Sequence, residues 1–582
     1  MELCSIIRPS QPRATVQVRF SDGRIFEGPP GHTLEEFACV ANPYPDVTYV
    51  AAVVDGGLVE LTMPVTRDVE VRLISTGDQD GMRIYRRSLV FLMVAAVRHL
   101  FPGCRLDVHH SMTFGGLFCH LENRPPFSDE ELALLKRHMQ ELVAQNLPIR
   151  RIEMSAAEAI AEFRARGDDE KAELLAQSNK KRVALYQLGD TRDHFHGYMV
   201  PSTGYLRWFD LVPYSDGFVL HYPRRHEPTV LQPFVASPRL AQVFEEYNQW
   251  LELMDVRSLP SLNRAVADGR IREVVLVSEA LHEQRIAAIA GEIARQRGRV
   301  RLVLIAGPSS SGKTTFARRL AVQLLANGLH PVALSLDNWF VDRERTPVDE
   351  FGQHDFEALE AIDLDLFNRH LRGLMAGQAV TLPEYNFLTG KSEPGQTLRI
   401  SRDHVILVEG IHGLNPNLVP AIPAEHVYRI YVSALTQLNL DRHNRVSTTD
   451  TRLVRRIVRD AARRGYTAAD TIGRWESVVR GEWRWIFPHQ EHADVMFNSA
   501  LVYELAVLRP LAEPLLLWVE PGTPERVEAE RLLSLLRWFT PCPTDLVPDN
   551  SILREFIGGS IMEEFQPWLR PNRHAGSEPL AV

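Results

Sequence analysis

Runs of apolar residues alternate with segments of helical spacing through the central part of this chain. Leu302–Ala306 is an uninterrupted apolar run of the length of a buried strand, and Thr315–Leu325 has apolar residues at helical spacing. Val332–Leu336 and Val405–Val408 are two further runs of strand length. Strands that alternate with helices in this way predict a doubly wound parallel sheet, so we expect an α/β domain over residues 281–500.

The beginning of the chain has a different pattern. Residues Val16–Phe20 alternate between apolar and polar side chains, as in a half-buried strand, and Tyr49–Val54 and Val69–Ile74 are further strand candidates. The Thr-x-x-Glu sequence at positions 33–36 has the spacing of a capping box at the start of a short helix. These elements predict a small mixed α+β module over residues 1–76.

A second α+β unit is expected over residues 77–235. The segment Tyr85–Leu100 is apolar enough for a buried helix and is followed by Phe-Pro-Gly, a helix stop signal. Ser128 and Ser155 each precede a glutamate by three residues, so both are expected to cap helices. Two strand candidates follow, at Arg182–Leu188 and Gly217–Tyr222.

The segment between this unit and the α/β domain, residues 236–280, is expected to be a helical connector. Helical spacing is found in Leu240–Met254 and Val277–Gln296. Pro260 and Asp268-Gly269 are predicted to interrupt the segment between these two helices.

The last part of the chain is predicted to be mainly helical. A final strand is expected at Asp494-Val495, and a helical extension should cover residues 501–570. The last residues, Asn572–Val582, have the composition of a frayed tail.

Composition limits the class of protein. The chain has 582 residues, which is enough for several domains, and its net charge of −9 does not indicate general nucleic-acid binding. Its five cysteines are scattered and form no C-x-x-C pair, which fits a reducing compartment. It has no signal-peptide pattern at its start and no apolar stretch of about 18 residues. We therefore expect a cytoplasmic protein that does not span a membrane.

The chemistry is concentrated after the run at 302–306, where the chain reads Gly-x-x-x-x-Gly-Lys-Thr. Glycines allow backbone N–H groups to converge on a phosphate, and the following helix adds its partial positive charge. Lys313 is expected to reach the outer phosphates, and the Thr314 hydroxyl to bind Mg²⁺. The predicted ATP-binding loop is Gly307, Pro308, Ser309, Ser310, Ser311, Gly312, Lys313, Thr314 and Thr315.

Two carboxylates follow the other predicted strands. Asp337 follows the run that ends at Leu336, and Glu409 follows the run at 405–408. Ligands bind at the carboxyl ends of parallel strands, so Gly307, Asp337 and Glu409 are expected to open onto one edge. Phosphoryl transfer to a hydroxyl needs positioned phosphates, Mg²⁺ and a carboxylate that accepts the proton. Asp337 suits the last role and Glu409 suits Mg²⁺, although a carboxylate here also has the position of a helix cap.

An arginine-rich segment lies near the end of the α/β domain. Residues 442–464 contain eight arginines and two acids. Arg452, Arg456 and Arg459 fall on one face of a helix. Because guanidinium groups pair well with phosphate oxygens, Arg456 and Arg459 are predicted to cover the triphosphate. An RNA-facing patch or salt bridges on the helix surface are the alternatives.

The order of the motifs GPSSSGKTT, SLDNWF, LPEYNF, VILVEGIHGL and RRIVRD resembles the uridine kinase and phosphoribulokinase family over roughly residues 300–500. The resemblance implies ATP and Mg²⁺ as cofactors, and Asp337 as the base or partner of the acceptor hydroxyl. It also implies that Tyr385 and Phe387 hold a nucleoside, although both also suit a core, and that Arg455 contacts the substrate. The histidine that uridine kinases carry three positions after the second aromatic is here Gly390, which puts the reading of a pyrimidine in doubt.

The front of the chain resembles other proteins. Residues 1–76 are similar in pattern to the TGS domain, a ubiquitin-like β-grasp module, and residues 77–235 to the editing domain of threonyl-tRNA synthetases. That domain binds a metal through four side chains, but the corresponding positions here are unsuited to Zn²⁺. They are Arg87, Phe91, Phe195 and Met199. The pairs His109-His110 and His194/His196 suit either another metal site or, more simply, neighbouring histidines.

The whole arrangement, including the tail Ser551–Ser560, resembles bacterial nucleoside kinases of the uridine kinase-like type. The first hypothesis is a kinase that transfers phosphoryl from ATP to a nucleoside, uridine or a relative, with another small alcohol as the alternative acceptor. The second is an NTP-dependent switch whose front domains bind RNA. RNA binding and homo-oligomerisation stay open, and no membrane partner is expected.

Overall fold

The computed structural model describes residues 13–41, 47–112, 114–349, 352, 354–387, 389–401, 403–563 and 565. The chain divides into two compact units. The first contains Met1–Ala236 together with Asn439–Arg445 and Glu520–Glu528, and the second contains the remaining three segments. The predicted tail Asn572–Val582 and the first twelve residues of the predicted β-grasp module lie outside the described residues.

The first unit begins with a five-stranded mixed sheet of order β2-β1-β5-β3-β4. Its strands are β1 (Val16–Phe20), β2 (Ile25–Gly28), β3 (Tyr49–Val54), β4 (Gly57–Glu60) and β5 (Val69–Ser75). Helix α1 (Leu34–Ala41) begins at the expected capping box, because the Thr33 N–H donates to Glu36 Oε2 at 2.7 Å. The alternation of apolar and polar residues in β1 places Val18 in the core of this module.

The remainder of the first unit is built around the apolar helix α2 (Gln79–Leu100), which is buried along most of its length. A four-stranded antiparallel sheet of order β11-β12-β7-β6 belongs to the same hydrophobic core. Helices α3 (Asp129–Ala144) and α4 (Ala156–Ala165) start at the capping boxes predicted at Ser128 and Ser155. The other elements are β6 (Arg105–Met112), β7 (Gly116–Glu122), β8 (Arg150–Ser155), α5 (Asp169–Gln177), β9 (Arg182–Leu188), β10 (Thr191–Asp193), β11 (Asp210–Tyr214) and β12 (Gly217–His221).

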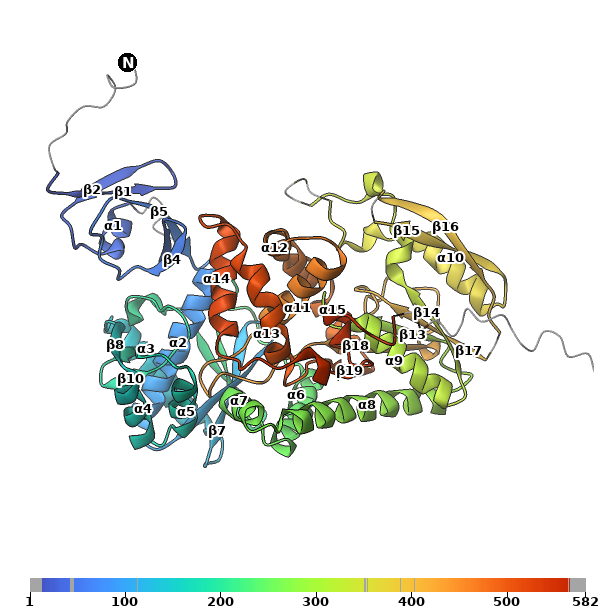
Figure 1. Ribbon diagram of the computed structural model, residues 1–582, viewed down its shortest axis with the longest axis horizontal. Coiled ribbons are helices and arrows are strands. Elements are labelled where there is room, and N and C mark those ends of the chain that lie inside the picture. The colour runs from blue at the N-terminus through green and yellow to red at the C-terminus, as the bar shows by residue number, and fades with distance from the viewer. Residues whose placement is uncertain are drawn as a thin grey trace, which may run out of the picture. The chain divides into compact units, whose positions relative to one another are not determined.

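The second unit has a five-stranded parallel sheet of order β14-β17-β13-β18-β19. The first apolar run forms β13 (Leu302–Ala306), whose five residues are all buried, at the centre of the sheet. The other strands are β14 (His330–Ser335), β17 (His404–Glu409), β18 (Val427–Ser433) and β19 (Val495–Asn498). The predicted doubly wound α/β architecture is therefore confirmed (Figure 1).

Helices and one hairpin complete the second unit (Figure 1). The hairpin is β15 (Val380–Asn386) and β16 (Lys391–Leu398). The helices are α6 (Pro238–Leu253), α7 (Leu259–Ala267), α8 (Ile271–Arg295), α9 (Lys313–Ala326), α10 (Leu364–Met375), α11 (Thr448–Arg463), α12 (Ala468–Trp485), α13 (Glu504–Leu517) and α15 (Arg554–Ile557), with the part of α14 (Pro524–Leu536) that follows Glu528. Within the described part of the chain, no helix is long and apolar enough to cross a membrane.

One prediction for the connector was wrong. Pro260 does not interrupt a helix but occupies the first turn of α7, where its missing N–H has no helical partner to lose. The break at Asp268-Gly269 is confirmed, because Gly269 has a φ of +76° just after the helix ends. Helix α8 starts soon afterwards and is longer than the predicted Val277–Gln296.

Candidate active site

The loop between β13 and α9 has the conformation of a phosphate cradle. A Cβ at Gly307 would overlap the Val432 carbonyl oxygen, so only glycine fits there. Gly312 has a φ of +85°, and a Cβ at this position would lie 2.5 Å from Ile552 Cγ2. Helix α9 begins directly after it, at Lys313. The N-terminus of this helix therefore adjoins the loop, as anion binding requires.

Side chains of the loop fit a triphosphate. The hydroxyls of Ser310 and Ser311 are buried, and neither makes a hydrogen bond to any described residue. Lys313 Nζ donates to the carbonyl oxygens of Gly307 at 2.9 Å and Pro308 at 3.0 Å, which keeps the ammonium group at the mouth of the loop. A cation and unpaired hydroxyl donors beside a helix N-terminus are the groups that phosphate oxygens need.

Glu409 ends β17 and lies beside the first turn of α9. Its Oε1 accepts hydrogen bonds from Thr314 Oγ1 at 3.4 Å and Ser335 Oγ at 3.2 Å. Burial, and then the neighbouring charge of Asp337, raise the pKa of Glu409 to about 7. A hydroxyl and a carboxylate that converge in this way are oxygen ligands of the kind that Mg²⁺ prefers, so the residues present fit this metal.

Asp337 lies in the short helical turn after β14, half-buried at the same edge of the sheet. Burial raises the pKa of Asp337, and the charges of Lys313 and Arg464 oppose that rise. Asp337 and Lys313 also affect the pKa of Glu409. The structure thus brings the three predicted catalytic side chains into one electrostatic neighbourhood at the carboxyl ends of the strands.

Two of the predicted phosphate-binding arginines lie on α11. Arg456 Nη1 donates to Ser309 Oγ of the loop at 2.8 Å. Arg459 pairs with Asp460, at 2.8 Å between its Nη2 and Oδ1. Both guanidinium groups are only partly exposed. Arg456 is therefore the predicted arginine that the structure places in contact with the loop.

A buried ion pair between α11 and α12 is hydrogen-bonded to the backbone of the phosphate-binding loop. Arg452 makes a two-pronged contact with Glu482 of α12, at 2.5 and 2.8 Å, and Arg452 Nη1 also donates to the Ser309 carbonyl oxygen at 3.1 Å. Glu482 in turn accepts a hydrogen bond from the Ser309 N–H at 2.9 Å. The sequence places Arg452 on the phosphate-facing side of α11, whereas both of its terminal nitrogens are bonded to protein groups.

Arg455 does not occupy a substrate-binding position. Its side chain is fully buried, its Nε donates to Glu504 Oε2 at 2.5 Å, and its Nη2 donates to the Ser499 carbonyl oxygen at 2.8 Å. The guanidinium also stacks on the Phe556 ring at 4.9 Å. The Arg455 Nη1 also donates to the Ser310 carbonyl oxygen of the loop at 3.4 Å. The expected contact with substrate is corrected on these grounds, because the guanidinium is fully buried and bonded to the protein itself.

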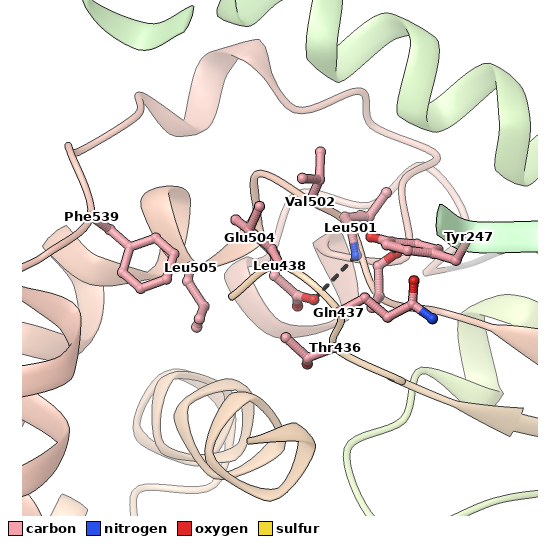
Figure 2. A pocket seen from close by; sticks show the side chains of 10 residues that line it. Tyr247, Thr436, Gln437, Leu438, Leu501, Val502, Glu504, Leu505 and Phe539 are labelled. Carbon is pink, nitrogen blue, oxygen red and sulfur yellow. Dashed lines mark hydrogen bonds between the residues drawn. The ribbon is translucent and has the colours of Figure 1, made fainter. Parts of the chain in front are cut away.

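The carboxylate of Glu504, the partner of Arg455, borders a small cavity shown in Figure 2. Glu504 points toward the Leu501 N–H, which donates to its Oε1 at 3.1 Å (Figure 2). The cavity has a volume of about 10 Å³, close to what one water molecule needs. Gln437 Oε1, which also lines it, has no hydrogen-bond partner among the described residues. The cavity suits one ordered water and is too small for a substrate.

Aromatic side chains form a wall beside the predicted base. The Phe340 ring lies 5.5 Å from that of Tyr385, 6.3 Å from Phe387 and 6.2 Å from Phe356. Tyr385 is 5% exposed and Phe387 is 61% exposed. The predicted pair therefore divides into a core residue that supports the wall and an outer residue whose ring is open to a ligand.

Position 390 has little room for a side chain. Gly390 has a φ of +71°, and a Cβ there would lie 2.8 Å from Arg343 Cζ and Nε. Arg343 is bonded to the same turn, because its N–H donates to the Gly390 carbonyl oxygen at 2.8 Å. The place of the histidine of uridine kinases is thus covered by an arginine from the loop after β14.

Sequence reasoning missed Glu357. Its carboxyl is half-buried, and burial followed by repulsion from Glu482 raises its pKa to about 7. Arg456, Asp337 and Lys313 also affect the pKa of Glu357, so the carboxyl lies in the same neighbourhood as the predicted base. Within the described residues, Glu357 does not directly follow a strand, so its position at the site is not evident from strand ends in the sequence.

A second missed residue is Glu555 on α15. The Thr315 N–H in the first turn of α9 donates to Glu555 Oε2 at 3.0 Å. Ile552 of the same C-terminal segment packs against Gly312. This carboxylate therefore occupies one of the N–H groups that the phosphate-binding motif offers to a nucleotide.

Among the predicted site residues, Thr314 and Glu409 line a cleft of about 400 Å³, together with Ser335. Its walls carry polar groups from α9, from the short turn after β14 and from the hairpin, including Arg318, Asn338, Glu384 and Gln396. The volume is sufficient for a small acceptor molecule beside the predicted Mg²⁺ ligands.

In the first unit, the positions that correspond to synthetase metal ligands do come together, but as packing. The Phe91 and Phe195 rings lie 5.3 Å apart. Arg87 Nη1 donates to the Tyr198 carbonyl oxygen at 2.7 Å, and Met199 Sδ is 3.3 Å from Ser88 Oγ. Among the described residues, no group of three or more His, Cys, Asp or Glu side chains is arranged to hold a metal. This includes the histidine pairs considered above.

Comparisons with known proteins give different matches for the C-terminal and the N-terminal regions of the chain. The model of the phosphoribulokinase / uridine kinase family matches residues 302–506. The N-terminal region is similar to threonine–tRNA ligases. Threonine–tRNA ligase 1 of Bacillus subtilis is 30% identical over 204 residues, which are 35% of this chain and 32% of the ligase. The ligase of Laribacter hongkongensis is 32% identical over 170 residues, 29% of this chain and 27% of the ligase.

The chain thus spans about a third of the length of these ligases. A solved structure described as a "possible uridine kinase" from Bacillus stearothermophilus matches with a TM-score of 0.26 and 20% identity, over 37% of this chain and 98% of that one. Residues 302–506 of this chain thus match the model of the phosphoribulokinase / uridine kinase family, and the N-terminal region is similar to threonine–tRNA ligases.

Proposed function

We propose that this protein transfers the γ-phosphoryl group of ATP to a hydroxyl of a nucleoside, uridine or a related compound. The observation that carries the proposal is the convergence of Lys313, Asp337 and Glu409 beside a phosphate-binding loop. The family match over residues 302–506 supports the same reaction class. Phosphoryl transfer depends mainly on positioning and on charge stabilisation, which these groups are suited to supply.

In the proposed reaction, Asp337 accepts the proton of the acceptor hydroxyl. The acceptor oxygen forms a bond to the γ-phosphorus while the bond between that phosphorus and the bridging β–γ oxygen breaks. ADP leaves with the electron pair of that bond, and the proton stays on Asp337 until solvent removes it. We expect Lys313 and Arg456 to stabilise the charge on the phosphate oxygens during transfer, which their contacts with the loop support.

The Thr314 hydroxyl and the Glu409 carboxylate would hold Mg²⁺, directly or through water. When bound, Mg²⁺ neutralises phosphate charge and orients the outer phosphates. The raised pKa of Glu409 means that its carboxyl takes up a proton near neutral pH in the unliganded protein.

The aromatic wall and Glu357 support a nucleoside as acceptor. The exposed Phe387 ring is available for stacking on a base, and a carboxylate such as Glu357 can accept hydrogen bonds from sugar hydroxyls. Another small alcohol is the alternative acceptor, because the polar walls of the cleft also suit a sugar.

A second candidate, an NTP-dependent switch that responds to RNA, rests on the similarity of the N-terminal region to threonine–tRNA ligases. The two candidates differ in their products. A kinase yields a phosphorylated acceptor in equal amount to ADP, whereas a switch yields ADP and inorganic phosphate.

The test is a screen of the full chain with Mg²⁺ and ATP against nucleosides and sugars, scoring both ADP and phosphorylated product by mass. We expect a nucleoside monophosphate to form. A phosphorylated sugar without nucleotide product would move the acceptor class to the alternative. ADP release without any phosphorylated acceptor, increased by tRNA, would contradict the kinase and favour the switch.

A further inference from the structure

The loop after β14 covers the turn of the hairpin. The Arg343 N–H donates to the Gly390 carbonyl oxygen at 2.8 Å, and the Ser392 N–H donates to Asp342 Oδ1 at 2.9 Å. These two bonds join the loop that begins at the predicted base to the turn of β15 and β16. The side chain of Arg343 is therefore held at a defined place beside that turn.

The guanidinium of Arg343 lies where a side chain of residue 390 would start. Its Nη2 donates to the Phe387 carbonyl oxygen at 2.7 Å, and its Cζ is 2.8 Å from the position of a Cβ on Gly390. The backbone at Gly390, with φ of +71°, also disfavours any side chain. An arginine and a histidine cannot both occupy this place, so Arg343 and Gly390 form a matched pair.

Not every N–H group of the Arg343 guanidinium donates a hydrogen bond to a described residue. Within the described parts of the chain, its one side-chain hydrogen bond goes to the Phe387 carbonyl oxygen, and no carboxylate pairs with it. Arg343 is half-buried, so the group keeps access to solvent or to a ligand. Arg452 and Arg455, by contrast, are buried and bonded to Glu482 and Glu504.

Arg343 is hydrogen-bonded to a residue of the aromatic wall. Its hydrogen-bond partner, Phe387, is the outer residue of that wall, and the Phe387 ring lies 5.1 Å from Tyr385 and 6.3 Å from Phe340. Phe340 follows Asp337 by three residues. A flat ligand stacked on the wall with its hydroxyl near Asp337 would extend toward Arg343 at its other end.

We propose that Arg343 is a specificity-determining residue that selects acceptors with oxygen lone pairs at the end remote from the reacting hydroxyl. The inference deepens the proposed kinase function and rests on it. A guanidinium donates hydrogen bonds and cannot accept them, whereas a neutral imidazole does both. An oxo group or an anionic group at that end is therefore favoured, and an amino group is rejected because two donors would face each other.

Uridine and cytidine test this directly, because they differ in an oxo or amino group on the base. The variant Arg343→Met keeps an unbranched side chain in place of the aliphatic part of arginine and removes its donors, and Arg345→Met, an exposed arginine of the same turn, is the matched control. Competition between the two nucleosides gives the ratio of their kcat/KM values. We expect the wild type and Arg345→Met to prefer uridine by about 10- to 100-fold, the usual effect of a charged hydrogen bond.

In Arg343→Met the ratio should fall to near one, mainly through loss of uridine turnover, with unchanged affinity for ADP. An unchanged ratio in this variant, or a preference of the wild type for cytidine, would overturn the role of Arg343 and leave the kinase function standing.

If the wild type phosphorylates neither nucleoside, sugar phosphates and sugar acids are compared with the neutral sugars. Preference for the anionic sugars that is lost in Arg343→Met supports the inference, and equal use of both overturns it. Absence of any phosphorylated product would remove the proposed function together with this inference.

Discussion

Two regions of this molecule are similar to known proteins, and they differ in the residues found at the positions where those proteins bind ligands. At the carboxyl edge of the parallel sheet, polar and charged side chains persist, and several are half-buried with perturbed pKa values. At the corresponding ligand positions of the synthetase-like region, Phe91 and Phe195 pack together and Arg87 bonds to a backbone carbonyl. Similarity of fold therefore coexists with retained chemistry in one region and with loss of it in the other.

The physical difference lies in stability. The packed aromatic pair is satisfied by its neighbours and gains free energy from burial. The carboxylates at the sheet edge are held near one another against their mutual repulsion, which costs stability unless a ligand or metal compensates. Such costs are typical of functional sites. The variants below therefore test whether a side chain serves ligand binding and catalysis or only the stability of the core.

The largest effect is expected at Asp337. Asp337→Asn removes the proposed proton acceptor and should lower kcat by about 10²- to 10⁴-fold, the usual contribution of a general base. Binding of ADP, measured by calorimetry, should be unchanged, because the phosphate loop is intact. Glu344→Gln, an exposed carboxylate in the following loop, is the control and should keep full turnover. Near-normal turnover of Asp337→Asn would mean that another group takes the proton.

The second effect concerns the synthetase-like region. Phe91→Ala should lower the free energy of unfolding by about 3–5 kcal/mol in urea titrations, because Phe91 is fully buried against Phe195. Phe91→His should be destabilised too, and added Zn²⁺ should not restore it, since Arg87, Phe195 and Met199 are not zinc ligands. Stabilisation of Phe91→His by Zn²⁺ would show that a metal site is still latent here.

A smaller, pH-dependent effect is expected at Glu357. Its pKa in the folded protein, about 7, is above the ordinary value of 4.5, so the charged form destabilises the fold above pH 7. Glu357→Gln should therefore be more stable than the wild type at pH 8, by at most about 3 kcal/mol. The difference should shrink as the pH falls from 7 and vanish below pH 4.5, where the carboxyl is protonated in both the folded and the unfolded state. Glu360→Gln, an exposed neighbour, should show no such trend in urea titrations.

The smallest effect is expected at Glu555, which shares the Thr315 N–H with an incoming phosphate. Glu555→Gln should bind ADP about 2- to 10-fold more tightly, corresponding to the free energy of roughly one hydrogen bond. Adenosine, which lacks phosphate, should bind equally well to both forms. Glu563→Gln, in the same C-terminal segment, serves as the control in the calorimetric titration. Weaker binding of ADP to Glu555→Gln would assign the carboxylate a supporting role instead.

Local pattern was sufficient for most elements of this fold. The capping boxes at Ser128 and Ser155, the buried run that forms β13, and the strands that end shortly before Asp337 and at Glu409 were all predictable. Each depends on residues within a few positions of one another, because caps, turns and short strands follow from local backbone geometry and side-chain spacing. Pro260 was misjudged because its effect depends on its place within the helical turn.

Only the tertiary structure decided which arginines and carboxylates serve the site. Arg455 and Arg456 are adjacent on α11, yet the first lies in the core against Glu504 and the second bonds to Ser309. Glu555 reaches Thr315 from 240 residues away. The sequence determined the sheet, the phosphate loop and the absence of zinc ligands at the synthetase positions. The roles of individual charged side chains depend on burial and on partners from distant segments, and those quantities exist only once the chain has packed.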